Sequence, residues 1–206
     1  MQLEQVTLTT PDLDLLNDFY GGRLGVATDY QQGTQLLVMI GSSRLVFVPG
    51  APACYHYAMR VPAARFDDAY GWLVQFTAPI SDMAGRDRFF SQSWDSDSVY
   101  AYSGRFDAGM LLSLCEIGIA TDDVPALVGE LAAVIGEGPF RGRQEPSFTA
   151  VGNANGLLIV VARGRIWYPE TGVAAQLLPL QIRVRRADSR QVLISGPQYQ
   201  IGADDA

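Results

Sequence analysis

The chain shows one order of hydrophobic patterns three times: an alternating stretch, a helical stretch, and then further alternating stretches. The first copy opens with LEQVTLTT, whose alternation of apolar and polar residues predicts a strand. In the segment that follows, Leu13, Leu16 and Tyr20 recur at helical spacing. We expect Thr10 to cap this helix and Pro11 to occupy its first position.

Three short strands complete the first unit, and the whole plan then restarts twice. The first unit's strands are expected around 25–30, 35–41 and 44–50, which gives a βαβββ unit. The second unit begins near residue 54. Its expected strands lie at 54–61, 88–94, 98–103 and 109–115, and its helix carries Phe66, Ala69, Tyr70 and Leu73 on one face.

The third unit begins near residue 115 and has the clearest helix. Thr121 or Asp122 is its expected cap and Pro125 lies in its first turn. The segments PSFTAVG, GLLIVVARG and RIWYPE are expected to supply its strands. After residue 179 two alternating stretches predict a C-terminal hairpin.

Length and composition place the chain among globular proteins. It has 206 residues, of which 48% are hydrophobic and 18% charged, enough to bury a core without disulfides. No stretch approaches the roughly 18 consecutive apolar residues of a membrane-spanning helix. The opening MQLEQVTLTT has neither a basic nor an apolar region of the kind found in signal peptides. We therefore expect a cytoplasmic protein with no membrane partner.

Charge, cysteine and histidine counts exclude several function classes. The net charge is −7 and the basic residues are scattered, so nucleic acid is not an expected partner. The two cysteines form no CxxC pair and are expected to be reduced. Because His56 is the only histidine, sites that need two or three histidines are excluded. A Ser-His-Asp hydrolase survives that count, but no G-x-S-x-G sequence supports it.

Three segments give the repeated pattern a family resemblance: TPDLDLLNDFYGGRLGV, HYAMRVPAARFDDAYGWL and SVYAYSGRFDAGMLLSL. With the βαβββ units they resemble the vicinal oxygen chelate superfamily, which includes glyoxalases, bleomycin-resistance proteins and extradiol dioxygenases, over residues 1 to about 170. The resemblance implies an α+β fold in which two βαβββ modules close a cup-shaped mixed sheet around a divalent metal. We expect that pair in 1–115 and a third module with the hairpin in 116–206.

The resemblance also implies where metal ligands would lie. The first-strand ligand position of the first module falls on Gln5, and that of the second module falls on His56. The last-strand position, normally a glutamate, falls on Ser113. A serine hydroxyl is a poor replacement for a carboxylate, so this departure from the family pattern weakens the expected metal site.

Other residues could contribute to a site. Strand alternation puts Cys54 on the same face as His56, and Cys115 on the same face as Ser113, so a softer His/Cys site is an alternative to packed thiols. Glu116 opens the third module at the position that corresponds to Gln5 and His56, as either a ligand or a solvated acid. Aromatic residues expected to line a ligand pocket are Trp94, Tyr100 and Tyr102, with Tyr55 and Tyr57 beside them.

Two functions follow from these residues. The first is a glyoxalase-like, metal-dependent lyase or isomerase acting on a small oxygen-bearing substrate. An extradiol dioxygenase is not expected, because that class needs more than one histidine. The alternative is a non-catalytic small-molecule-binding module with a degenerate metal site, as in the bleomycin-resistance branch.

The odd number of modules predicts a homodimer. Family modules work in pairs, so the module in 116–170 lacks an internal partner, yet GLLIVVA and RIWYP are too apolar to remain exposed. A second copy packed about a two-fold axis would cover them. A third hypothesis for the function is that the chain is a scaffold, which needs no intact pocket.

Overall fold

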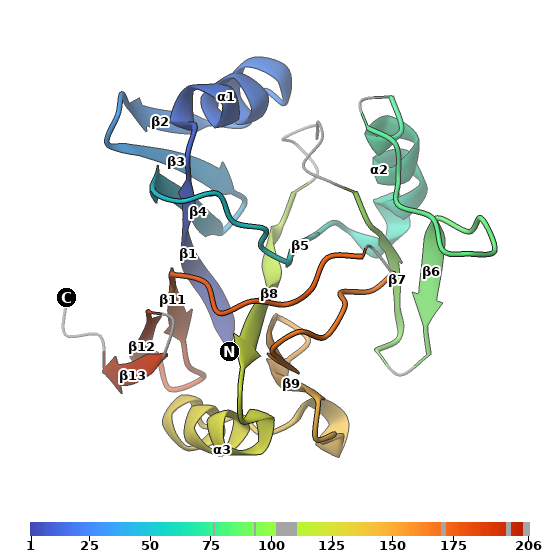
Figure 1. Cartoon of the computed structure of the whole chain (residues 1–206). Helices are drawn as coiled ribbons and strands as arrows, with labels where there is room; N and C mark the ends of the chain where they lie inside the picture. The colour runs from blue at the N-terminus through green and yellow to red at the C-terminus, as the bar shows by residue number, and fades with distance from the viewer. Residues whose placement is uncertain (76, 93, 102–110, 170–171, 197–198, 204–206) are drawn as a thin grey trace.

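The computed structural model describes residues 1–75, 77–92, 94–101, 111–169, 172–196 and 199–203 (Figure 1). The first unit is the βαβββ module that the pattern predicts. Its elements are β1 (Gln2–Thr10), α1 (Leu13–Asn17), the π-helical turn η1 (Asp18–Arg23), β2 (Thr28–Gln31), β3 (Gln35–Ile40) and β4 (Ser43–Pro49). β1 runs parallel to β4, and β4, β3 and β2 form an antiparallel meander.

The second unit is split between two sheets. Its elements are β5 (Tyr57–Arg60), the 3-10 turn η2 (Ala63–Arg65), α2 (Phe66–Leu73), β6 (Arg88–Ser91) and β7 (Ser96–Val99). β6 and β7 form a separate hairpin, which Figure 1 shows beside α2. The strand expected at 109–115 falls partly on residues 109–110, outside the described residues.

The third unit forms a four-stranded sheet in the order β5-β8-β10-β9. Its elements are β8 (Ser113–Thr121), α3 (Val124–Ile135), the 3-10 turn η4 (Phe140–Gly142), β9 (Phe148–Asn153) and β10 (Gly156–Ala162). β8 runs parallel to β10 as β1 does to β4, so the first and third units share one plan. RIWYPE, expected as a strand, makes only an isolated bridge at Ile166.

The C-terminal strands extend the first module and not the third. They are β11 (Leu180–Arg185), β12 (Gln191–Ser195) and β13 (Gln200–Ala203). β11 pairs antiparallel with β1, which gives a seven-stranded sheet in the order β13-β12-β11-β1-β4-β3-β2. The α+β architecture of repeated βαβββ units is therefore confirmed. Among the described residues, no helix has the length and apolar character needed to cross a membrane.

The pairing of the modules differs from the expected pairing. One hydrophobic core joins the first module to the third: Leu3 and Val6 of β1 pack in it with Ile117 of β8 and Leu131 of α3. The expected boundary at residue 115 falls inside β8, whose start pairs with β5 and whose remainder pairs with β10. The first module thus packs against the third, because those two bury matching apolar faces.

Both faces of β10 are covered within the chain. Leu158 and Val160 face the shared core, while Leu157, Ile159 and Val161 face a second core on the other side of the sheet. Trp167 and Ala175, from the segment between β10 and β11, complete that second core. The apolar strand β10 is buried, as expected. Other parts of the same chain bury it, whereas a second copy of the chain was expected to do so. The homodimer stays a prediction: the chain itself covers β10, whereas Ile166 and Tyr168 of RIWYP are 45% and 49% exposed.

The helix caps lie slightly later than expected. Asp12 caps α1 by accepting a hydrogen bond from the backbone N–H of Leu15 at 2.8 Å. Asp123 caps α3 by accepting from the N–H of Ala126 at 3.0 Å. The threonines expected as caps lie two residues earlier in each case, and their hydroxyls accept from the N–H of the capping aspartate. A threonine followed two residues later by aspartate therefore starts both helices.

A pair of tyrosine hydroxyls ties the second unit to the first. Tyr20 of η1 and Tyr57 of β5 are 2.7 Å apart through their hydroxyl oxygens. Burial raises the pKa of both hydroxyls. We expect Tyr20→Phe to lower the free energy of unfolding by about 1–2 kcal/mol, because it leaves the Tyr57 hydroxyl without its partner.

The double variant Y20F/Y57F tests the same pair, and urea unfolding is the measurement. Its cost should be smaller than the sum of the two single costs, since no polar group is then left alone. A raised pKa means that the folded state keeps protons that the unfolded state releases above about pH 10. The wild-type chain should therefore lose stability more steeply above that pH than the double variant. Additive single costs would contradict the pairing.

Candidate functional site

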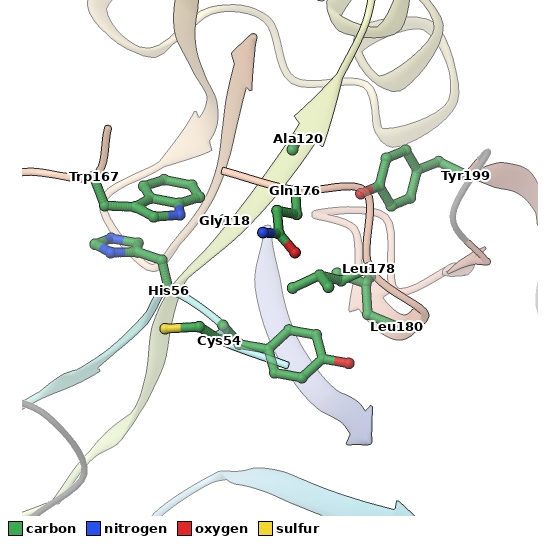
Figure 2. Close-up of a pocket in the computed structure, with 10 residues that line it drawn as sticks. Cys54, His56, Gly118, Ala120, Trp167, Gln176, Leu178, Leu180 and Tyr199 are labelled. Carbon is green, nitrogen blue, oxygen red and sulfur yellow. The ribbon is translucent and has the colours of Figure 1, made fainter. Parts of the chain in front are cut away.

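His56 lies just before β5 and opposite Gly118 of β8. Its backbone carbonyl accepts a hydrogen bond from the N–H of Gly118 at 2.7 Å. The side chain stacks on the Trp167 ring, with centroids 4.6 Å apart and ring planes 6° apart. Figure 2 shows the two rings face to face. The only histidine is thus held between a strand and an indole.

Gly118 makes this stack possible. A Cβ at residue 118 would lie 2.4 Å from Cη2 of Trp167 and 3.1 Å from Cβ of His56. A glycine inside a strand often marks a close approach by another group, and here that group is the indole ring. The absence of a side chain at residue 118 lets Trp167 lie directly on β8.

Glu116 is the charged neighbour of His56. Its Oε2 lies 3.9 Å from Nε2 of His56, and the two side chains are 18% and 17% exposed. The strand register explains why Glu116 points this way. Ala58 pairs with Glu116 and Met59 with Leu114, so Cys115 is the extra residue of a β-bulge. Past the bulge, alternation puts Glu116 and Gly118 on one face of β8.

Further aromatic rings lie beside His56. Tyr100 is 6.3 Å from the imidazole between ring centroids, and it packs edge to face with Phe89 and Tyr168. Burial raises the pKa of the Tyr100 hydroxyl, and the negative charge of Glu116 raises it further. Tyr100 therefore stays neutral at physiological pH and acts as a hydroxyl-bearing apolar surface.

A small, shallow hollow opens beside His56, and its free space of about 230 Å³ includes open solvent. Figure 2 shows the His56–Trp167 stack at one end and Tyr199 at the other, with the Gln176 amide between them. Burial raises the pKa of Tyr199 to about 12, so its hydroxyl is neutral. The lining residues are Cys54, Tyr55, His56, Gly118, Ala120, Trp167, Gln176, Leu178, Leu180 and Tyr199.

The expected metal ligands do not meet in the described part of the chain. Ser113 lies five residues before Gly118 on β8, roughly 15 Å away along the strand. Its hydroxyl is buried and has no hydrogen-bond partner. Gln5 donates from its amide to Thr7 Oγ1 at 3.3 Å, on β1. The Tyr55 hydroxyl, next to His56 in sequence, lies 2.8 Å from Thr9 Oγ1, four residues beyond Gln5 on β1.

The donor chemistry does not fit a divalent metal either. Within the described residues, no three His, Cys, Asp or Glu side chains lie together in a way that could hold a metal ion. Burial raises the pKa of Cys115 to about 12, whereas metals bind the thiolate. Cys54 and His56 do line the same hollow, as alternation predicts, but there they leave only Glu116 as a third donor. The residues present do not fit the family's metal centre.

The expected pocket residues separate into different places. Tyr100 is beside His56, whereas Trp94 stacks on Phe148, with ring centroids 6.3 Å apart, at a different pocket. Tyr102 lies outside the described residues. Tyr55 lines the hollow with its hydroxyl turned away to donate to the carbonyl of Pro179 at 2.7 Å. Tyr57 belongs to the tyrosine pair described above.

Sequence reasoning missed Trp167, Gly118 and Gln176. Trp167 and Gln176 belong to the segment between β10 and β11, where no hydrophobic period indicates which way a side chain points. Gly118 offered a usable signal, because an isolated glycine in a strand pattern predicts a close approach. That signal indicates the place but not the partner.

Comparisons with known proteins give a likeness of fold alone. No family model matches the chain, and no curated protein matches it. A variant of glyoxalase I from Zea mays aligns over 97% of this chain and 90% of its own, with 10% identity and a TM-score of 0.44. A variant of homoprotocatechuate 2,3-dioxygenase from B. fuscum aligns over 100% of this chain and 73% of its own, with 13% identity and a TM-score of 0.42.

Proposed function

We propose that this chain is a small-molecule-binding protein that works without a bound metal, with its site in the hollow beside His56. The observation that carries the proposal is the His56–Trp167 stack over Gly118. One face of the imidazole packs on the indole, and Glu116 lies 3.9 Å from its Nε2. His56, the most favourable of the expected metal ligands, is thereby part of an aromatic wall.

The hollow offers groups suited to recognition. Leu178 and Leu180 give apolar walls, and Trp167 gives a flat one. The Gln176 amide brings both a donor and an acceptor, and the Tyr199 hydroxyl brings another. Mostly apolar walls with a few convergent polar groups are typical of small-molecule sites. The ligand class that fits is a small, flat molecule with at least one hydrogen-bonding group.

The metal-dependent lyase or isomerase expected from the family resemblance has less support. It needs several oxygen or nitrogen donors on one centre, each within roughly 2 Å of the metal. Ser113 lies five residues along β8 from Gly118, which is opposite His56, and the Gln5 amide is bonded to Thr7 on β1. The binding module is therefore the function that the geometry supports best.

Metal content distinguishes the two functions. We expect the chain, purified without chelator and dialysed against zinc, nickel and manganese in turn, to retain far less than one metal ion per chain, because its donors are not gathered. Inductively coupled plasma mass spectrometry is the measurement. His56→Ala should leave the metal content unchanged. One retained ion per chain that this variant loses would overturn the proposal.

Ligand-observed NMR with a library of neutral aromatic fragments tests binding directly. Fragments that bind the hollow should bind Gln176→Ala about three- to tenfold more weakly, which is the contribution of one hydrogen bond. Gln75→Ala, which changes an exposed glutamine of the second unit, is the matched control. A library in which every binding fragment is indifferent to Gln176→Ala would count against this site.

A further inference from the structure

We propose a second binding site, for planar aromatic carboxylates, at the outer edge of the four-stranded sheet. It is a pocket of about 410 Å³, partly open to solvent, compared with about 230 Å³ for the hollow beside His56. The second core, which includes Ala120, Ala150 and Trp167, lies between the two. This site is separate from the one proposed above and does not depend on it.

Three aromatic side chains from distant parts of the sequence form the walls. Phe148 belongs to β9, the edge strand, and Phe140 to the turn that follows α3. Trp94 comes from the connection between β6 and β7. The Trp94 and Phe148 rings are close to parallel, with 22° between their planes. Flat aromatic walls select flat ligands, because such rings stack with an offset.

The pocket is pre-formed. The hydroxyl of Thr149, a residue only 1% exposed, accepts from the N–H of Glu145 and donates to the carbonyl of Glu145, both at 3.1 Å. Gly152 donates from its N–H to the carbonyl of Gly138 at 3.1 Å, at the other end of the same loop. The loop is thus fastened to β9 on both sides of the pocket, and little ordering is required on binding.

The charges around the pocket favour an anion, although the chain as a whole carries −7. Arg143 lines the pocket, and no ion pair engages it in the described part of the chain. The guanidinium of Arg165 lies 4.8 Å from the centre of the Phe148 ring, and that of Arg141 lies 5.3 Å from the centre of Phe140. Within the lining itself, Arg143 and Glu145 are the charged side chains, and Arg165 adds a positive charge next to Phe148.

These features together define the ligand class. An aromatic ring would pack against Trp94 and the edge of Phe148, and a carboxylate at its edge would reach Arg143. Arginine suits a carboxylate because its planar fork donates two parallel hydrogen bonds. Glu145 would repel a second negative charge, so a monocarboxylate fits better than a dicarboxylate.

Isothermal titration calorimetry with 2-naphthoate and its neutral analogue 2-naphthamide tests the site at low salt. We expect 2-naphthoate to bind about tenfold more tightly than 2-naphthamide, the value of one charge-assisted hydrogen bond in a partly exposed site. Arg143→Gln should remove that difference by weakening 2-naphthoate alone. Trp94→Leu should weaken both compounds, because it removes a wall that they share.

Three control variants test whether the effects on binding are confined to this pocket. Arg65→Gln removes an exposed arginine of the second unit and should leave both affinities unchanged. Glu145→Gln should leave 2-naphthoate binding as tight or tighter. Gln176→Ala, in the hollow beside His56, should not alter it, so the two sites can fail independently. Equal affinities for the two compounds, or full 2-naphthoate binding by Arg143→Gln in a folded variant, would overturn the proposal.

Discussion

Gly41→Ala is expected to destabilise the chain by roughly 3–5 kcal/mol, the largest effect of any single substitution considered for this fold. Gly41 lies in the turn between β3 and β4 and has a φ of +54°. A Cβ there would lie 2.1 Å from the carbonyl oxygen of Leu112 and 2.7 Å from that of Leu111. These are backbone atoms, which cannot turn aside as a flexible side chain can.

The same turn holds the first module against the third. The N–H of Ser42 donates to the carbonyl of Leu112 at 3.0 Å. The Ser43 hydroxyl donates to the carbonyl of Leu3 at 2.7 Å and accepts from the N–H of Leu114 at 3.1 Å. A side chain at residue 41 would force the turn away from β8 and break these links. The cost therefore includes part of the interface between the modules.

Gly33→Ala is the matched control. Gly33 also has a positive φ, +70°, but a Cβ there would meet nothing within 4 Å. It should cost only the strain of the left-handed backbone, roughly 1 kcal/mol. Urea unfolding of both variants measures the difference. Equal losses of stability in the two variants would show that a Cβ at residue 41 does not clash with the backbone of Leu111 and Leu112.

Local signals in the sequence were enough to predict the elements of the first and third modules. Alternation and helical spacing concern neighbouring residues, so they reflect which face of an element is buried. GLLIVVA was predicted to be too apolar to remain exposed, and β10 is buried. Local signals contain no information on what covers each face. The packing of the third module against the first within the chain was therefore not predicted, and the homodimer stays a prediction.

The site was predictable only as separate residues. His56 and Glu116 were both candidates from their positions at the starts of modules, but their pairing depends on the bulge at Cys115. A bulge changes which residues share a face, and the sequence of β8 does not mark it. Trp167 reaches His56 from a segment of irregular structure, more than a hundred residues later. No spacing rule connects the two.

The contacts of Glu116 and Trp167 with His56 are both made on one side of the four-stranded sheet. The face of β8 opposite the shared core carries Glu116, Gly118 and Ala120, and the segment between β10 and β11 covers it with Trp167. The indole of Trp167 thus occupies the space next to His56 and Gly118. A methyl group at residue 118 would take up space that the indole now occupies. It should therefore disrupt the site without removing any polar group.

Gly118→Ala makes that change, and we expect it to cost about 1–3 kcal/mol of stability and to abolish binding in the hollow. The new methyl group would occupy space now filled by Cη2 of Trp167, at 2.4 Å. The indole belongs to the second core and cannot swing freely, so it must shift off His56. Tryptophan fluorescence and the fragment-binding assay measure the displacement.

Two further variants separate this contact from a general effect of alanine in a strand. Gly202→Ala, in β13, adds a methyl group that meets nothing within 4 Å and should change stability by less than about 0.5 kcal/mol. Trp167→Leu shortens the side chain over residue 118. If overlap with the indole is the cause, adding Gly118→Ala to Trp167→Leu should cost much less than adding it to the wild-type chain. An equal loss of stability on both backgrounds would mean that the His56–Trp167 stack does not require a glycine at residue 118.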